Sequence, residues 1–286
     1  MKTKLATRLR VGQIRYLNTL PFYHGLSASL EGRGVEWSWE AGTPSEISRA
    51  LSEGTIDMAP ISSIEYLQHQ DQYLLFPGLC IGSRDFSASV LLLSPERIEG
   101  LDGATISLTE ESLSAAALAK ILLKFKYRFQ NQFRVDPSNP AEMLANAKAC
   151  LIIGDQALFF CSKEFLYKTD LSEVWWDWAE LPFCFSVWAV RKKVYQEHPE
   201  EVNGFYQKLK TNLMRNLQDI EKLLRDGLGV TIVDEKFPTV FGYLFNLNYA
   251  LDEEMQRGLE RFCERAHEMD LVPRALEKLE FIDGSV

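Results

Sequence analysis

Short apolar runs alternate with longer amphipathic segments along the first half of the chain, from residue 10 to about residue 155. The short runs predict buried strands, and segments with apolar residues every three or four positions predict helices. We expect strands before Asn18 and at residues 57–61, 104–109, 132–135 and 150–153. We expect helices at residues 44–53, 64–72, 113–129 and 140–148. This alternation is typical of βαβ units around a parallel sheet.

The pattern changes after this first series of helices. Residues 73–83 and 89–94 are extended and apolar, and residues 95–103 form a polar connector. A long apolar strand follows at residues 181–190. We interpret the first pair as a crossing between two lobes and the later strand as the return crossing. The remaining helices are expected at residues 199–225, near 234–244 and at 253–269.

Two crossings between α/β lobes predict the two-lobed type II periplasmic-binding-protein-like fold, with a cleft between the lobes that closes about a hinge. Lobe 1 is expected to comprise residues 1–93 and 188–286, and lobe 2 is expected to comprise residues 94–187.

Polar or glycine-containing turns follow four of the expected strands. The carboxyl ends of parallel strands meet at one edge of a sheet, where open α/β proteins hold small anions. The sequence therefore predicts one cleft lined by hydroxyls, amides and backbone N–H groups. The candidate residues are Asn18, Ser62, Ser63, Thr109, Ser112, Ser114, Gly154 and Asp155.

Composition narrows the possible ligands. The 286 residues, 46% apolar and 25% charged, are typical of a soluble globular protein large enough for about two lobes. The net charge of −9 and the absence of a Lys/Arg run exclude a nucleic-acid footprint and disfavour anionic membranes. An anionic ligand must therefore be held by local donors.

Neither a secretory signal nor a membrane span is expected, because no apolar run of sufficient length follows the basic start of the chain. We therefore expect a cytoplasmic protein. The cysteines are odd in number, widely spread and without a C-x-x-C pair, so we expect buried thiols and no metal site. They are Cys80, Cys150, Cys161, Cys184 and Cys263.

Five strings in order resemble the bacterial chorismate dehydratases of the futalosine route to menaquinone. They are YLNTLPF (16–22), APISSIEY (59–66), SVLL (89–92), IGDQAL (153–158), and LPF with WA (181–189). The resemblance extends over nearly the whole chain from about residue 9. It implies the cytoplasmic version of the two-lobed fold and a hydro-lyase that converts chorismate to 3-[(1-carboxyvinyl)oxy]benzoate without metal or organic cofactor.

In this reaction the C4 hydroxyl of chorismate leaves, the C3 proton is lost and the ring becomes aromatic. An enzyme must bind two carboxylates, stabilise charge in the ring carboxylate, assist hydroxide departure and exclude water. A histidine would be the expected general base, yet of the four only His24 lies near one of these strings. The resemblance implies instead that the enolpyruvyl carboxylate of the substrate takes the proton.

Asn18 and Ser89 are the expected catalytic residues, because they match the family's strings. Asn18 would hydrogen-bond the departing hydroxyl or a carboxylate; its alternative role is a helix N-cap. Ser89 would orient the leaving group or the enolpyruvyl carboxylate; its alternative is a strand hydroxyl bonded to backbone. Whether Ser87 or Ser89 faces the substrate is left open by the local sequence, Asp85-Phe86-Ser87.

The other candidates are expected to bind substrate. Ser62 or Ser63 in lobe 1, and a site formed by Thr109, Ser112 and Ser114 in lobe 2, would hold carboxylates at helix N-termini; plain capping is the alternative. Gly154 would allow close backbone approach, and Asp155 would orient a donor or fix the turn. The acidic pair at residues 110–111 is expected to be a solvated turn, and Trp175, Trp176, Trp178 and Trp188 are expected to be packing residues.

Two other functions are considered. A non-catalytic binding protein for a small carboxylate would use the same fold, since fold does not determine function. A related later enzyme of the same pathway, which makes a dihydroxynaphthoate, lacks the Tyr-Leu-Asn-Thr-Leu-Pro string near its N-terminus. Chorismate is thus the expected small-molecule partner, with no nucleic acid or membrane, and the oligomeric state is left open.

Overall fold

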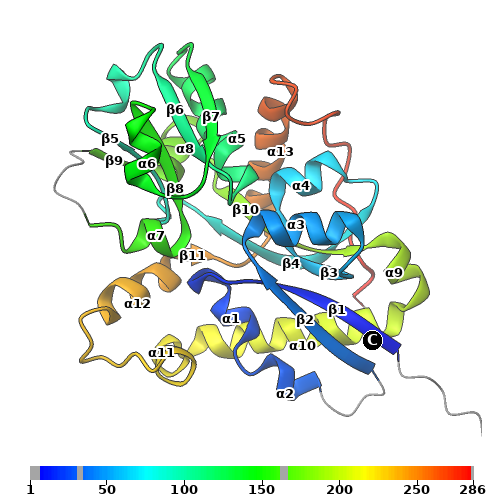
Figure 1. Cartoon of the computed structure of the whole chain (residues 1–286). Coiled ribbons are helices and arrows are strands. Elements are labelled where there is room, and N and C mark those ends of the chain that lie inside the picture. The colour runs from blue at the N-terminus through cyan, green and yellow to red at the C-terminus, as the bar shows by residue number, and fades with distance from the viewer. Residues whose placement is uncertain (1–6, 31–34, 162–166, 285–286) are drawn as a thin grey trace, which may run out of the picture.

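Two β-sheets, each flanked by helices, build the computed structural model of the chain (Figure 1). The structure describes residues 7–30, 35–161 and 167–284. The six-stranded sheet has the order β11-β4-β10-β3-β1-β2, with β1 (Thr7–Ile14), β2 (Val35–Gly42), β3 (Met58–Ser62), β4 (Tyr73–Ser83), β10 (Phe183–Arg191) and β11 (Leu247–Asn248). The five-stranded sheet has the order β7-β6-β8-β5-β9, with β5 (Val90–Ser94), β6 (Thr105–Thr109), β7 (Gln132–Asp136), β8 (Ala149–Ile153) and β9 (Tyr167–Asp170).

Each sheet has a parallel part and an antiparallel part. Strand β1 pairs in parallel with β2 and β3, and β6 pairs in parallel with β7 and β8, as the alternation of strands and helices predicted. Strand β10 is antiparallel to β3 and β4, and β5 is antiparallel to β8 and β9. Strands β5 and β10 are antiparallel to their neighbours because each enters its sheet from the side of the other lobe.

The chain passes between the two sheets twice. It leaves the six-stranded sheet after Ser83 and joins the five-stranded sheet at Val90, and it returns between Asp170 and Phe183 through helix α8 (Leu171–Ala179). These passages fall a few residues before the lobe limits at residues 93 and 188 expected from the sequence.

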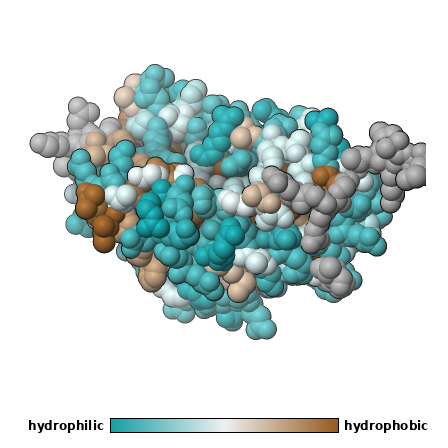
Figure 2. Space-filling model, turned by 90° about the horizontal axis from the view of Figure 1, so that it is seen from below, coloured by the Kyte–Doolittle hydropathy of each residue, from teal (hydrophilic) through white to brown (hydrophobic). Residues whose placement is uncertain are grey.

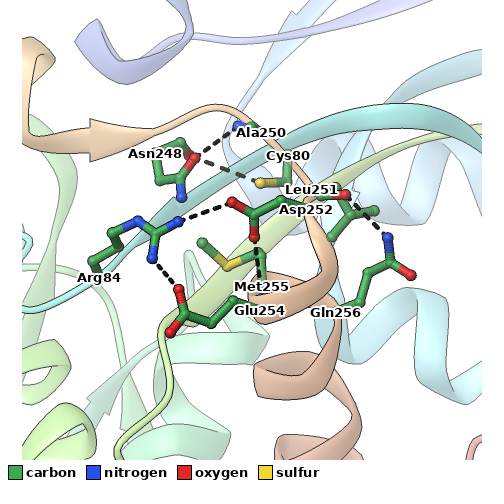
Figure 3. A network of polar contacts seen from close by, with 9 residues as sticks. All are labelled: Cys80, Arg84, Asn248, Ala250, Leu251, Asp252, Glu254, Met255 and Gln256. Carbon is green, nitrogen blue, oxygen red and sulfur yellow. Dashed lines mark hydrogen bonds and ion pairs between the residues drawn. The ribbon is translucent and has the colours of Figure 1, made fainter.

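An ionic network joins the first passage to the start of helix α13 (Glu253–His267) (Figure 3). The guanidinium of Arg84 donates to Asp252 at 2.9 Å and also contacts Glu254. The Asp252 carboxylate in turn accepts the N–H of Met255 at 2.9 Å and so caps the helix. Arg84 therefore ties the segment between the lobes to a helix that packs on β10, α4 and α5.

The helices cover both sheets. They are α1 (Leu20–Tyr23), α2 (Leu26–Leu30), α3 (Pro44–Glu53), α4 (Ser63–Gln68), α5 (Leu113–Ile121), α6 (Pro140–Ala145), α7 (Gly154–Leu158), α9 (Lys192–Glu197), α10 (Pro199–Gln218), α11 (Ile220–Leu228) and α12 (Phe237–Asn246), with short turns η1 (Leu17–Thr19), η2 (Ile98–Gly100) and η3 (Leu122–Lys126). Helix α3 has the bounds predicted from sequence, because a Thr43–Glu46 capping box begins it and Gly54, at φ 78°, ends it.

Two expected helices differ in the structure. The helix expected at 199–225 is two helices, because Asp219 ends α10 and its side chain caps α11 by accepting the N–H of Lys222. The helix expected at 113–129 changes to π geometry after Ile121 and ends before Arg128, whose φ of 61° is left-handed. Both breaks depend on single residues that interrupt an otherwise continuous apolar periodicity.

The core confirms the expected packing of two of the tryptophans. Trp175 and Trp188 are fully buried; Trp188 stacks on Phe76 with ring centroids 5.8 Å apart. The cysteines are free thiols and all are buried except Cys161, which is exposed. Within the described ranges, no helix combines the length and apolar character that crossing a bilayer requires.

Helix α12 has two contrasting faces. Val240, Tyr243 and Leu244 are buried, whereas Phe245 is 69% exposed. The view from below in Figure 2 is mostly hydrophilic, with a compact hydrophobic patch on the side where Figure 1 places α11 and α12. The inward face of α12 reaches the neighbourhood of the cavity described next.

Candidate active site

A partly open cavity lies between the two sheets, at the carboxyl ends of β1, β3 and β8 and beside the start of α5. The space inside it that is open to water is about 50 Å³. Its walls come from both sheets, so closing or opening the lobes changes it. It is lined by Ile14, Tyr16, Asn18, Pro44, Ser62, Ile81, Ser89, Val90, Ser112, Ile153, Gly154, Phe185, Ser186 and Leu247.

The cavity brings together five of the candidate residues from separate strand ends: Asn18, Ser62, Ser89, Ser112 and Gly154. Ser62 and Ser112 also cap helices, since their Oγ atoms accept the N–H groups of Glu65 and Ala115 at 3.2 Å. A hydroxyl oxygen that accepts a hydrogen bond still has its own proton to donate. Capping and ligand binding are therefore compatible at these two serines.

The remaining candidates lie outside the cavity lining. Ser63 donates to the carbonyl of Cys184 at 2.7 Å, and the Oγ of Ser114 accepts the N–H of Ile64 at 3.1 Å; both serines are fully buried. The Oγ1 of Thr109 accepts the N–H of Glu111 at 3.2 Å. Ser63 thus uses its proton within the protein, whereas Ser114 and Thr109 are set apart from the site by their position outside the lining.

Asn18 does not cap a helix. The cap positions of η1 and α1 are Tyr16 and Thr19, and neither helix has a side-chain cap. The Oδ1 atom of Asn18 is buried and has no hydrogen-bond partner among the residues that the structure describes, whereas its backbone carbonyl accepts the hydroxyl of Tyr249 at 2.9 Å. An unpaired buried amide oxygen is costly, on the order of 1–3 kcal/mol, unless a ligand satisfies it.

Ser89, rather than Ser87, is at the cavity wall. Its Oγ accepts the hydroxyl of Tyr243 at 3.1 Å, and its carbonyl accepts the N–H of Gly154 at 2.8 Å. Ser87 instead donates through both N–H and Oγ to the carboxylate of Asp170. Burial raises the pKa of Asp170, and backbone N–H donors around it oppose that shift. This turn holds Ser89 against Gly154.

Segment 16–17 of the six-stranded lobe bonds the other lobe beside the cavity. The hydroxyl of Tyr16 donates to Glu111 Oε2 at 2.6 Å, and the N–H of Leu17 donates to Asp155 Oδ1 at 3.0 Å. Burial and the Glu111 bond raise the pKa of Tyr16, and burial raises the pKa of Asp155. Residues 110–111 form the expected turn and Glu110 is exposed, but Glu111 is half-buried and not freely solvated, because a tyrosine of the opposite lobe lies within reach of its carboxylate.

The cavity is electrically neutral on its walls. Over the described part of the chain, its lining contains no Lys, Arg or His. The nearest candidate base by sequence, His24, lies beside Gly227 instead. Among the residues that the structure describes, no group of three or more His, Cys, Asp and Glu side chains could hold a metal ion. The arrangement can offer hydroxyl donors and an amide acceptor to a small polar ligand, and can exclude water.

Sequence reasoning missed several residues of the site. Ser186 lines the cavity and could have been noticed in the sequence, because it is a small polar residue inside the apolar strand β10. Its Oγ already donates to the carbonyl of Ile61 at 2.8 Å. Tyr16 is inside the first matched string and was not singled out. Tyr243 had no local signal, because only the docking of α12 brings it to Ser89.

The fold and the cavity define a class of protein, the two-lobed α/β proteins of the periplasmic-binding-protein fold whose site lies between the lobes. Among solved structures, a protein from Archaeoglobus fulgidus has a TM-score of 0.69 at 17% identity, covering 93% of this chain and 98% of that one. The periplasmic aliphatic sulphonate-binding protein of Escherichia coli has a TM-score of 0.63 at 16% identity, covering 95% of each chain.

Sequence comparison then gives the family. The chain belongs to the menaquinone biosynthesis family, whose model matches residues 9–268. A curated relative, the chorismate dehydratase of Thermus thermophilus, is 28% identical over 271 residues, which is 89% of this chain and 93% of the relative.

Proposed function

We propose that the chain is a chorismate dehydratase, a carbon–oxygen hydro-lyase that forms 3-[(1-carboxyvinyl)oxy]benzoate. The family match and the Thermus relative support this function. The observation in the structure that carries it is the position of Asn18 and Ser89 on the walls of one cavity, Asn18 after a strand of the six-stranded sheet and Ser89 before a strand of the five-stranded sheet. Both residues belong to the strings by which the sequence resembles this family.

The reaction is an elimination. The C3–H bond breaks and its electron pair forms the C3–C4 double bond, while the C4–O bond breaks and its pair leaves with the hydroxide. The enolpyruvyl carboxylate takes the proton, so the substrate supplies its own base. Aromatisation drives the reaction, and its electrons balance without an oxidant or reductant, so we propose that no metal or organic cofactor takes part.

The protein contributes neutral donors and exclusion of water. The free protons of Ser62 and Ser112 would donate to substrate carboxylates from opposite lobes, and Gly154 would let backbone approach closely. Fixed donors in a site without water stabilise developing charge more strongly than solvent does. Asn18 and Ser89 would act at the departing hydroxyl.

Substrate entry requires the lobes to separate. Small-molecule sites are usually about 300–1,000 Å³, well above the 50 Å³ open inside this cavity. The bonds from Tyr16 to Glu111 and from Leu17 to Asp155 would break on opening and form again on closure around the substrate. Closure would bring Asn18 toward Ser89.

The test is direct. Purified protein, treated with a chelator, is incubated with chorismate, and the aromatic product is followed by ultraviolet absorbance and mass spectrometry. We expect one equivalent of water to be lost from each chorismate. A Ser89→Ala variant is the control for contaminating activity. Unchanged chorismate at high protein concentration would exclude the lyase, and binding without turnover would leave a carboxylate-binding protein.

A further inference from the structure

Tyr243 lies directly behind the two expected catalytic residues. It is buried in α12, with 3% of its surface exposed, and it is not part of the cavity lining. Its hydroxyl donates to the Oγ of Ser89 at 3.1 Å, and the Asn18 side chain lies close enough to the phenol to lower its pKa as a hydrogen-bond donor. One phenol thus joins a side chain from β1's end to a side chain from the start of β5.

The number of hydroxyl protons determines which group donates in each hydrogen bond of Tyr243. Tyr243 has one hydroxyl proton, which goes to Ser89, so it must accept from Asn18, and the donor there is the amide N–H. This agrees with the unpaired Oδ1 of Asn18. The Oγ of Ser89 receives the phenol proton and keeps its own proton for another partner.

We propose that Tyr243 is a positioning residue that fixes Ser89 as the hydrogen-bond donor and Asn18 Oδ1 as the acceptor on the cavity wall. The inference rests on the proposed function. A substrate hydroxyl needs one acceptor for its proton and one donor for its oxygen, and this pair supplies both. The C4 hydroxyl of chorismate therefore donates to Asn18 and accepts from Ser89.

The electrostatic surroundings keep Tyr243 in its donor form. Burial raises the pKa of its phenol, the nearby carboxylates of Asp155 and Asp170 raise it further, and the bonds to Ser89 and Asn18 oppose the shift. The phenol stays protonated at neutral pH. Charge on the departing oxygen grows as the C4–O bond breaks, so the Ser89 bond strengthens in the transition state and mainly affects kcat.

Tyr243→Phe is the first test, because it removes both hydrogen bonds and keeps the ring. We expect kcat to fall by about tenfold or more, with KM changed by no more than about twofold. Tyr23→Phe is the matched control: Tyr23 is another inward tyrosine, whose hydroxyl donates to the Gly12 carbonyl at 2.8 Å within lobe 1. It should retain wild-type kcat.

A double-mutant cycle with Ser89→Ala separates positioning from packing. If Tyr243 acts through Ser89, then Tyr243→Phe has little further effect once Ser89 is alanine. Additive losses in the cycle, or an unchanged kcat for Tyr243→Phe alone, would overturn the inference. Site-specific fluorotyrosine at position 243, which keeps both bonds, should restore most of kcat even if the phenylalanine variant folds poorly.

The outcome also distinguishes this inference from the proposed function. Wild-type protein that dehydrates chorismate while Tyr243→Phe is fully active leaves the function in place and removes the role of Tyr243. Wild-type protein that leaves chorismate unchanged removes the function, and with it the substrate assignment made here.

Discussion

Ser62 and Ser63 are neighbours in the chain, yet only one of them faces the cavity. The Oγ of Ser62 accepts a hydrogen bond as a helix cap, so its hydroxyl proton is available to a ligand. Ser63 instead donates its hydroxyl proton to the Cys184 carbonyl. Ser112 and Ser114 differ in another way at the start of α5: the Oγ of each accepts a backbone N–H, but only Ser112 lines the cavity. At residues 62 and 63, what separates the ligand donor from the structural hydroxyl is therefore where its proton goes, and not its exposure, since both serines are buried.

The largest expected loss of turnover comes from replacing Asn18, whose side-chain oxygen is free to bind a ligand. Asn18→Ala removes an amide oxygen that no described residue of the protein hydrogen-bonds. We expect turnover to fall by an order of magnitude or more with little change in thermal midpoint. The matched asparagine is Asn212, whose Nδ2 donates to the Phe22 and His24 carbonyls. Asn212→Ala should lower the midpoint and keep its activity per folded molecule; the reverse pattern would make Asn18 structural.

The next effect concerns closure. Gly154 has φ +59°, and a Cβ there would lie 3.0 Å from the ring of Tyr16 in the other lobe. Gly154→Ala should hold the lobes apart and lower kcat/KM by about tenfold, with a left-handed backbone cost of about 1–2 kcal/mol. Gly103→Ala is the control, because Gly103 also has positive φ but nothing lies near its Cβ. Equal activity losses in both variants would remove the closure role.

Ser62 and Ser63 should respond differently to substitution by alanine. Ser62→Ala should raise KM several-fold and cost about 1 kcal/mol of stability through the lost cap. Ser63→Ala should cost a similar free energy of unfolding, about 1 kcal/mol, with KM unchanged. Substrate titrations and denaturant unfolding of both variants measure this. A KM change in Ser63→Ala as large as in Ser62→Ala would show that proton use does not separate the two.

The effect expected to be smallest at neutral pH involves a buried phenol outside the cavity lining. Burial raises the pKa of Tyr66 to about 12, against a bond from the Glu280 N–H that lowers it. Below about pH 10 the Tyr66 phenol is protonated in both the folded and the unfolded protein, so its contribution to the free energy of unfolding is complete there. As the pH rises toward the pKa of the folded state, this contribution is lost with a slope of about 1.4 kcal/mol per pH unit. Tyr66→Phe should flatten alkaline unfolding between about pH 10 and pH 12. An unchanged slope would contradict the assignment.

Much of the fold follows from local patterns. Helix α3 has its predicted bounds because Thr43, Glu46 and Gly54 act within one helix. Strands β3, β5 and β8 are buried along their whole lengths, as continuous apolar runs predict. The break at Asp219 was not predicted, because one capping residue overrides a periodicity that continues on both sides of it.

The sequence by itself determined which strand ends carry polar turns, since alternation, capping residues and glycine act over a few neighbouring positions. It thereby placed Asn18, Ser62, Ser112 and Gly154 among the candidates, whereas Ser89 became one through the family resemblance. Only the tertiary structure decided which hydroxyls keep a free proton, that Tyr16 meets Glu111, and that Tyr243 lies behind Ser89. Those outcomes depend on partners up to 154 residues away in the chain, whose approach is set by packing of the two lobes and not by local sequence.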